Sequence, residues 1–500
     1  MRSGGWRGPT PIPLPDLDPL DPVRITLLAR AEGGESDGGI ELTRPVLRAA
    51  PEPTAPVLPP EADARLSALR EAGRGRPPVL IYLIDTLRAD HLGSYGYHLD
   101  TSPNLDAFAD DAVRFSRSTA QSGWTRTSVA SIFTGLHPRS HDVNDREDMM
   151  SSSAVTLATV LRANGYDTTG FITNGNVAAT FGLDHGFDTY VYLRERKTDE
   201  IHVQSDELNE RALGWLEARD VDRPFFLYLH SVDPHDPYTP RSPFRERFIE
   251  TQQFPELATL RNLFRTPAAD RDVPALSQEL TALYDAEIAF NDHHFGELIR
   301  WLKANALYEQ TLLLVMSDHG EAFYEHGRWG HGNSLYQELI SVPLLVKLPG
   351  QVGAGLVIDE PAQHVDAMPT ILDLLDIPIP DAVQGRSLLP AVASGQVDPT
   401  TQTTAYLQLD TRHLESVQTI RRKLIRHPMS DRTGGRVELY DLVDDPFELQ
   451  DLAGTRAVAR RHLMVELMEA ALARPTLLET SEAVIDAELE DRLRALGYVR

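Results

Sequence analysis

Residues 79–85 read VLIYLID, a run of apolar and aromatic side chains that ends in an aspartate. A run without alternating polar residues is typical of a strand that is buried on both faces of a sheet. Four comparable runs follow, at 168–174 (TTGFITN), 224–230 (PFFLYLH), 311–319 (TLLLVMSDH) and 342–350 (VPLLVKLPG). Together these runs predict the strands of one central sheet.

Helical patterns separate the predicted strands. The segments 156–165 (TLATVLRANG), 205–220 (SDELNERALGWLEARD) and about 279–305 place their apolar residues with helical spacing. A chain that alternates strands and helices in this way is expected to form an α/β fold. Its largely parallel central sheet is then covered by helices on both faces.

The C-terminal part of the chain has a different pattern. Short strand-like segments occur at 405–410 (AYLQLD), 417–426 (VQTIRRKLIR) and 437–442 (VELYDL), with turn signals between them. Closely spaced short strands of this kind predict a small C-terminal antiparallel sheet.

Composition divides the chain into four regions. Residues 1–75 are rich in Pro, Gly and charged residues, and we expect an N-terminal β-fragment and a Pro-rich linker there. The α/β domain is expected at 76–395 and the antiparallel subdomain at 396–475. A charged tail is expected at 476–500.

Charge and cysteine usage exclude several classes of function. The chain has 500 residues and a net charge of −26, from 48 basic and 74 acidic residues, so we expect no nucleic-acid partner. It has no cysteine, which excludes disulfides, thiolate catalysis and cysteine-ligated zinc. An anionic substrate would need local positive charge, for which a bound metal ion is the obvious source.

The sequence as written contains neither a recognisable signal peptide nor a membrane span. Its N-terminal residues lack an apolar core, and no apolar run approaches the roughly 20 residues of a spanning helix. The location and the oligomeric state of the protein are therefore left open by the sequence.

Polar residues collect where the predicted strands end. Asp85 ends the first run, Asn174 the second, and Asp318 and His319 the fourth, while His235 lies just beyond the third. The carboxyl ends of parallel strands share one edge of a sheet, where ligands bind. Carboxylate oxygens and imidazole nitrogens suit a divalent cation such as Ca²⁺, Mg²⁺, Mn²⁺ or Zn²⁺. We therefore expect a metal site at this edge.

A cluster of hydroxyl side chains lies in the stretch 123–135, GWTRTSVASIFTG. Thr125, Thr127 and Ser128 precede apolar residues with helical spacing, which places them at the N-terminus of a helix. Free N–H groups and the helix dipole favour an anion or an alkoxide at that position. A hydroxyl becomes a competent nucleophile when a metal lowers its pKa, although the pattern does not single out one of the three.

Several blocks of sequence, in order, resemble a known family. The blocks are DTLRADHLGSYGY (85–97), TSPNLDAFADDAVRF (101–115), TRTSVASIFTG (125–135), SDHGEAFYEHGRWGHG (317–332) and HVDAMPTILDLLDIPIPDAVQGRSLLP (364–390). They look like the sulfatase-type domain of the alkaline phosphatase superfamily, over about residues 79–390. The segment 438–453 (ELYDLVDDPFELQDLA) resembles the C-terminal strand region of that family. The domain at 76–395 is thus expected to be a sulfatase-like catalytic domain.

The resemblance implies a role for Thr125. Sulfatases carry Cys or Ser, converted to formylglycine, in a C/S-x-P-S-R motif, and Thr125 stands at that position. Thr127 replaces the proline, Ser128 matches the serine, and Val129 replaces the arginine. Threonine cannot become formylglycine, but a threonine nucleophile is familiar in the superfamily's phosphodiesterases and phospho-group transferases. Thr125 is therefore the expected nucleophile, and Thr127 and Ser128 are expected to serve the helix cap.

The resemblance also implies a set of metal ligands. Asp85, Asp318 and His319 match ligand positions of the family, with the Thr125 oxygen as a further ligand. Thr86 stands where sulfatases often have a second acidic residue. One divalent ion is expected rather than two.

Three further residues are expected at the site by resemblance. His235 matches a histidine that contacts the transferred group or the leaving oxygen, and His331 stands where many sulfatases have a lysine. Asn174 lies in FITNGNV, in place of a GKWHLG block, so a neutral donor is expected where two basic residues are usual. A second metal ion held by Asp233, His235 and His331 is the less favoured alternative.

The resemblance implies a metal-dependent hydrolase with an anionic ester substrate. The threonine favours a phosphate ester, diester or monoester, cleaved through a covalent Thr125 intermediate, while His235 or His331 protonates the departing oxygen. Three alternatives stay open: a sulfuric ester hydrolase that uses unmodified threonine, a phospho-group transferase, and a catalytically silent binding module. Many relatives are exported, so a periplasmic or extracellular location would follow if the natural start lies upstream.

Overall fold

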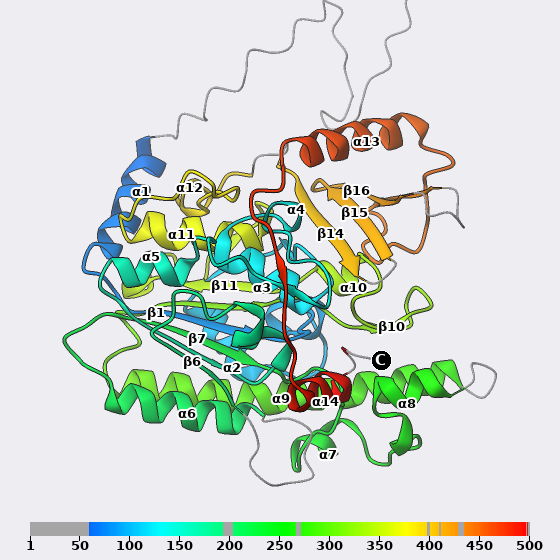
Figure 1. The fold of residues 1–500 in the computed structure, drawn as a ribbon, viewed down its shortest axis with the longest axis horizontal. Coiled ribbons are helices and arrows are strands. Elements are labelled where there is room, and N and C mark those ends of the chain that lie inside the picture. Colours follow the sequence, from blue (N-terminus) through cyan, green and yellow to red (C-terminus); the bar gives the residue numbers. More distant parts are fainter. Residues whose placement is uncertain are drawn as a thin grey trace, which may run out of the picture.

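The computed structural model describes residues 60–193, 204–266, 272–397, 401–409, 412–428, 435–496 and 498. Within these ranges, eight strands form one central sheet in the order β12-β2-β11-β8-β1-β7-β5-β6 (Figure 1). The strands are β1 (Val79–Ile84), β2 (Val113–Phe115), β5 (Asp167–Ile172), β6 (Thr189–Tyr192), β7 (Phe225–Ser231), β8 (Leu312–Ser317), β11 (Leu344–Lys347) and β12 (Val357–Ile358).

The central sheet is largely parallel, as predicted. Strands β8, β1, β7, β5 and β6 run parallel to one another. Strand β11 runs antiparallel to both of its neighbours, β8 and β2. The carboxyl ends of β1, β5, β7 and β8 therefore meet at a common edge.

Helices cover both faces of the sheet (Figure 1). The larger ones are α2 (Pro103–Asp110), α3 (Thr125–Thr134), α5 (Leu157–Ala163), α6 (Ser205–Ala218), α9 (Val273–Ala304) and α11 (Ala367–Leu374). On one face, Ile81 and Leu83 pack with side chains of α3, α5 and α11. On the other, Tyr82 and Ile84 pack with α2, α6 and α9. Strand β1 thus contributes alternate side chains to two apolar layers, which explains why its sequence has no polar residue.

Short elements complete the α/β domain. They are β3 (Ser118–Thr119), β4 (Asp148–Met149), β9 (Ala322–Phe323), β10 (Trp329–Gly330), β13 (Ala362–Gln363), α4 (Pro138–His141), α7 (Phe244–Phe248), α8 (Leu260–Arg265), α10 (Gln337–Ile340) and α12 (Leu389–Ser394). Across the described ranges, no helix is long and apolar enough to cross a bilayer.

The N-terminal boundary differs from the prediction for 1–75. Residues 60–73 form helix α1 (Pro60–Gly73) rather than a linker. Ala62, Leu66 and Leu69 recur with helical spacing and are buried, and the two leucines join the core of the α/β domain. The expected β-fragment falls in 1–59, outside the described residues.

The predicted small antiparallel sheet is present and has four strands in the described part of the chain. The strands are β14 (Thr403–Leu409), β15 (Arg412–Gln418), β16 (Arg422–His427) and β17 (Arg436–Asp441), and helix α13 (Ala457–Leu472) packs beside them. The segment 417–426, read as one strand, is divided by a turn. The Thr419 hydroxyl accepts hydrogen bonds from the N–H groups of Arg421 and Arg422 and so closes that turn.

The region 476–500, expected to be a charged tail, has regular structure in its described part. Strand β18 (Ser481–Glu482) pairs with β4, and helix α14 (Ala487–Ala495) follows. In Figure 1 this part of the chain runs from α13 across the α/β domain to α14. We call residues 481–496 together with Tyr498 the C-terminal segment.

A buried ion pair ties the antiparallel sheet to the α/β domain. Lys423 Nζ on β16 lies 2.8 Å from Glu448 Oε1, and neither side chain has exposed surface. Glu448 Oε2 accepts a hydrogen bond of 2.7 Å from the Gln337 N–H at the start of α10. Removal of one partner of such a pair leaves an unpaired charge in the interior.

Lys423→Met is therefore expected to lower the free energy of unfolding by about 3–5 kcal/mol. The matched control is Lys303→Met. It breaks the ion pair between Lys303 and Asp111, in which the lysine side chain is 51% exposed. An exposed pair contributes less than about 1 kcal/mol. Urea denaturation of both variants measures the difference. Equal losses would contradict a stabilising role for the buried pair.

Candidate active site

The polar residues predicted at the strand ends lie together at the common edge of the sheet. Asp85 follows β1, Asn174 follows β5, and Asp318 and His319 follow β8, and all four are fully buried. The side-chain amide of Asn174 donates a hydrogen bond from Nδ2 to Asp85 Oδ2. His235 lies four residues beyond β7 and is 1% exposed. The parallel topology therefore brings these residues from four strands to one place.

The donor atoms of three of these residues converge in a way that fits a divalent cation. His319 Nε2 lies 4.0 Å from Asp85 Oδ1 and 3.5 Å from Asp318 Oδ2. Both carboxylate oxygens are buried and have no hydrogen-bond partner. His319 Nδ1 donates to the Gly320 carbonyl over 2.8 Å, which leaves the Nε2 lone pair facing the carboxylates. Two buried carboxylates with unmatched oxygens beside one imidazole are the donor set that a hard or borderline divalent cation requires.

Other groups hold these ligands in place. Asp318 Oδ1 accepts hydrogen bonds from the N–H groups of Thr86 (3.1 Å) and His319 (2.9 Å). Thr86 has a φ of 55°, a left-handed conformation that is uncommon for a threonine, and its buried hydroxyl has no partner. The strained backbone of Thr86 thus lies between the two carboxylates, because Thr86 follows Asp85 in the chain and its N–H bonds Asp318.

Burial and mutual repulsion act on the two carboxylates. Burial, followed by the negative charge of Asp85, raises the pKa of Asp318 to about 6. Burial also opposes ionisation of Asp85, but the neighbouring imidazoles of His235 and His319 and the hydrogen bond from His230 outweigh it and lower the pKa of Asp85 overall. A cation bound between the two aspartates would favour the ionised form of both.

Thr125 lies beside this donor set. It is the first residue of α3, and its Oγ1 lies 3.0 Å from His319 Nε2. Of the three hydroxyls in the first turn of α3, those of Thr125, Thr127 and Ser128, the Thr125 oxygen is the one that contacts a residue of the converging set. The free N–H groups at the start of α3 favour negative charge at the same place.

The predicted capping role of Thr127 and Ser128 is wrong. Thr127 Oγ1 donates to the Val143 carbonyl (2.8 Å), and Ser128 Oγ donates to the Ser122 carbonyl (3.0 Å). The N-cap residue of α3 is Trp124, and no side chain caps the helix there. Because helix α3 is entirely buried, both hydroxyls donate hydrogen bonds to carbonyl groups of neighbouring loops and do not bond the free N–H groups at the helix end.

The histidines predicted to handle protons stand next to each other. The ring centroids of His235 and His331 are 4.7 Å apart, and those of His331 and His319 are also 4.7 Å apart. His235 Nδ1 donates to the Asp236 carbonyl, while its buried Nε2 has no partner. His331 Nδ1 lies 3.1 Å from Glu321 Oε1. Burial lowers the pKa of His235 to about 4 and that of His331 to about 3.

The alternative second metal set does not form one cluster. Asp233 Oδ2 accepts hydrogen bonds from the Ser205 N–H and hydroxyl at the start of α6, and Asp233, His235 and His331 are not among the converging sets of ligand atoms. In the described residues, the sets of three or more ligand atoms that converge are Asp85–Asp318–His319 and the partly exposed His293–His294–Glu297 on α9.

Two residues at the site were not predicted. His230, the penultimate residue of β7, places Nε2 3.3 Å from Asp85 Oδ2. The Tyr498 hydroxyl oxygen lies 2.9 Å from Thr125 Oγ1 and 2.8 Å from Asn174 Nδ2. Burial raises the pKa of Tyr498 well above its usual value, so the phenol is neutral. The histidine ends an apolar run and could have been added to the strand-end set, whereas nothing in the local sequence LRALGYVR connects Tyr498 to the site.

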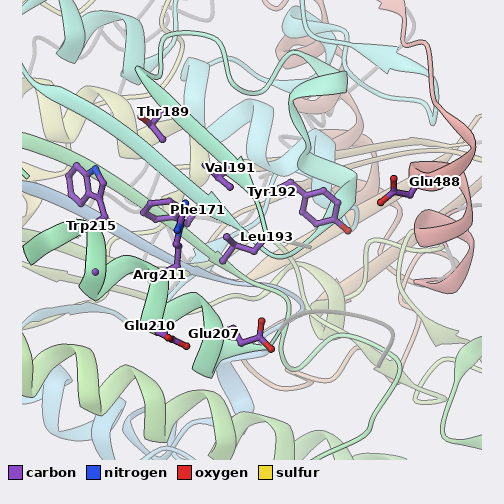
Figure 2. A pocket seen from close by; sticks show the side chains of 11 residues that line it. Phe171, Thr189, Val191, Tyr192, Leu193, Glu207, Glu210, Arg211, Trp215 and Glu488 are labelled. Atoms are coloured by element: carbon purple, nitrogen blue, oxygen red, sulfur yellow. The ribbon is translucent and has the colours of Figure 1, made fainter. Parts of the chain in front are cut away.

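Two cavities differ in their position relative to this cluster. A cavity of about 1250 Å³ lies between β5, β6 and α6, and the residues that line it include Phe171, Tyr192 and Trp215 (Figure 2). None of the predicted site residues lines it. A cavity of about 330 Å³ is bounded by Trp124 and Arg126, the two neighbours of Thr125 in sequence, and by Tyr498. The smaller cavity is therefore the one that adjoins the candidate active site.

Comparison with known proteins identifies the family of the chain. The family model described as Sulfatase matches residues 77–377. The chain belongs to the sulfatase family. A second model, N-sulphoglucosamine sulphohydrolase, C-terminal, matches residues 324–473, which include the antiparallel sheet. The sulfatase family lies in the alkaline phosphatase superfamily, its enzymes use divalent metal ions, and this member is a hydrolase of sulfuric or phosphoric ester bonds.

Relatives of this sulfatase-family chain differ in their named activities. N-acetylglucosamine-6-O-sulfatase from Bacteroides thetaiotaomicron is 22% identical, over 79% of this chain and 86% of that protein. The multifunctional alkaline phosphatase superfamily protein PehA from Trinickia caryophylli is 25% identical, over 77% and 92%. The crystal structure of the phosphonate monoester hydrolase of Agrobacterium radiobacter has a TM-score of 0.65 at 22% identity, covering 80% of this chain and 96% of that one. The structural match supports the fold.

Proposed function

We propose that this sulfatase-family hydrolase cleaves a phosphate ester by transferring the phosphoryl group to Thr125. The observation that carries the proposal is the position of Thr125 Oγ1, 3.0 Å from His319 Nε2 and next to two buried carboxylates with unmatched oxygens. A hydroxyl at such a place can be activated as a nucleophile.

The proposed mechanism assigns one role to each group. Asp85, Asp318, His319 and the Thr125 oxygen would hold a divalent cation, which supplies positive charge beside the nucleophile. The Thr125 alkoxide attacks phosphorus in line, and the bond to the departing oxygen breaks. His235 delivers a proton to that oxygen from Nε2, while Nδ1 keeps its own proton on the Asp236 carbonyl. It does so as an imidazolium, the form that the negative charge of the bound substrate favours against the burial that lowers its pKa to about 4. Water then attacks phosphorus, and His235 takes its proton.

The charge of the site favours a substrate that carries one negative charge. Asp85 and Asp318 together offset the two charges of a divalent cation. The Asn174 amide and the Tyr498 phenol next to Thr125 are neutral donors. A phosphate diester has one negative charge and a phosphate monoester has two at neutral pH, so we propose a diester as the better substrate.

A sulfuric ester is the second candidate. It also carries a single negative charge, and relatives of the chain are named as sulfatases. In that case unmodified Thr125 would accept a sulfuryl group by the same steps.

Parallel assays on three nitrophenyl esters test the proposal. With the protein loaded with a divalent cation, kcat/KM for bis-nitrophenyl phosphate is expected to exceed that for nitrophenyl phosphate by at least about 10-fold, which corresponds to about 1.4 kcal/mol of discrimination. Nitrophenyl sulfate is expected to be slower than the diester. Fastest turnover of the sulfate would favour the sulfuric ester candidate, and no turnover of any ester by the loaded protein would contradict both.

A further inference from the structure

The C-terminal segment is firmly anchored where it reaches the active site. The Ala483 N–H on this segment donates to the Glu147 carbonyl over 2.7 Å. Leu489, Leu493 and Leu496 are 1–2% exposed and belong to the same apolar cluster as Trp124, which precedes the proposed nucleophile. Hydrogen bonding and apolar burial therefore fix the segment against the catalytic domain.

Tyr498 is held at a defined position by this segment. Its backbone N–H donates to the Leu493 carbonyl over 2.7 Å, so it is tied to the end of α14. Tyr498 is 4% exposed, and its ring centroid lies 5.3 Å from that of His235 and 5.8 Å from that of His331. The phenol thus packs inside the site, next to the proposed proton carriers.

The directions of the hydrogen bonds around Thr125 follow from the groups that can only donate or only accept. An Asn174 N–H donates to the Tyr498 oxygen, since an amide nitrogen cannot accept. In the proposed mechanism the Thr125 oxygen reacts as an alkoxide, which has no proton and can only accept a hydrogen bond. The Tyr498 hydroxyl therefore donates to Thr125 Oγ1, over 2.9 Å.

We infer that Tyr498 is a catalytic residue of this enzyme, whose phenol donates a hydrogen bond to the Thr125 oxygen and stabilises the negative charge that develops there. The inference rests on the proposed function, in which Thr125 forms a covalent intermediate. Tyr498 lies outside both segments that match the family models, 77–377 and 324–473. The donor is thus supplied by a part of the chain that neither family match contains.

The role matters most when the intermediate is released. Water attacks phosphorus, the bond from phosphorus to Thr125 Oγ1 breaks, and its electron pair stays on that oxygen. The proton of the water passes to His235, which restores the proton that His235 gave to the first leaving group. A preorganised donor aimed at the oxygen that gains charge lowers the barrier of this step. Loss of the donor should slow release more than formation of the intermediate.

The test uses Tyr498→Phe in the full-length, metal-loaded protein, with bis-nitrophenyl phosphate as the probe. Removal of one preorganised donor costs about 100-fold in kcat, and we expect a loss of that order. We also expect a rapid burst of nitrophenol in stopped-flow traces and a phosphoryl adduct on Thr125 in quenched samples analysed by mass spectrometry. A purely structural role would produce neither the burst nor the adduct.

Tyr190→Phe is the matched control. The Tyr190 hydroxyl donates to the Val177 carbonyl over 2.8 Å, near the site but without contact to Thr125. This variant also loses one phenol oxygen, and we expect turnover within about 2-fold of the parent, since a neutral hydrogen bond contributes mainly to stability.

Three outcomes have distinct meanings. A Tyr498→Phe variant that is as fast as the parent, or faster, would overturn the inference and indicate that the segment merely covers the site. A slower variant without adduct, in a series where Thr125→Ala is inactive, would overturn the inference alone. An active Thr125→Ala variant would overturn the proposed function and the inference together.

Discussion

Thr125→Ala is expected to lower kcat/KM by about 10,000-fold or more, because it removes the proposed nucleophile and one ligand of the cation in a single change. The protein should remain folded. Thr125 Oγ1 bonds only to side chains, His319 and Tyr498, so its loss leaves no backbone group of α3 without a partner. Steady-state kinetics on the preferred nitrophenyl ester, with circular dichroism of the same samples, measures both quantities.

Two variants of the same helix are matched controls for Thr125→Ala. Thr125→Ser keeps the hydroxyl and should retain activity within about 10-fold, because only the positioning methyl group is lost. Ser128→Ala removes a hydroxyl three residues away that bonds the Ser122 carbonyl, so it should cost about 1 kcal/mol of stability and little activity. Near-normal turnover by Thr125→Ala, or equal losses in Thr125→Ala and Ser128→Ala, would contradict the nucleophile assignment.

The sequence pattern was sufficient to predict the central sheet and the group of residues at its edge. The uninterrupted apolar run of β1 indicated a strand buried on both faces, and β1 does lie between β7 and β8. Parallel strands place their carboxyl ends together, so Asp85, Asp318 and Asn174 could be assigned to one edge from the sequence alone. Which residues meet at this edge depends on the order and direction of the strands, and the alternation of strands and helices in the sequence predicts a parallel sheet.

Features that depend on contacts between distant segments could not be predicted. Thr127 and Ser128 are common capping residue types, but the burial of α3 supplies them with loop carbonyls instead. Tyr498 reaches Thr125 only because leucines of α14 pack against a cluster formed by other parts of the chain. A stretch of sequence rich in charge, such as the one around α14, does not show which surface its few apolar residues will cover.

Asp318→Asn is expected to abolish high-affinity metal binding and to lower activity by at least about 1,000-fold. The substitution keeps the acceptor oxygen for the N–H groups of Thr86 and His319. It replaces the second oxygen, one of the two unmatched carboxylate oxygens near His319 Nε2, by an amide NH2 group, whose nitrogen cannot ligate a cation. Metal content by mass spectrometry should fall from about one ion per chain in the parent to a trace in the variant.

Although Asp318→Asn should lower metal binding and activity, it should raise the stability of the metal-free protein. Without an ion, Asp85 and Asp318 are two buried carboxylates that repel each other, and burial together with the charge of Asp85 raises the pKa of Asp318 to about 6. Replacing one by a neutral amide removes the repulsion, so the metal-free variant should melt at a higher temperature than the metal-free parent. Added metal should raise the melting temperature of the parent in proportion to the logarithm of its concentration, and leave the variant unchanged.

Asp366→Asn is the matched control for this experiment, because it also replaces a buried aspartate. Both Asp366 oxygens accept backbone hydrogen bonds, from Gln363 and Arg386, and an asparagine can keep only one of them. This variant should therefore melt at a lower temperature than the parent and keep the metal-dependent shift. If Asp318→Asn retained the ion, the ligand assignment would be wrong. If the parent neither contained nor took up any ion, the catalytically silent binding module would be favoured, because the unmatched oxygens of Asp85 and Asp318 would then have no cation to bind.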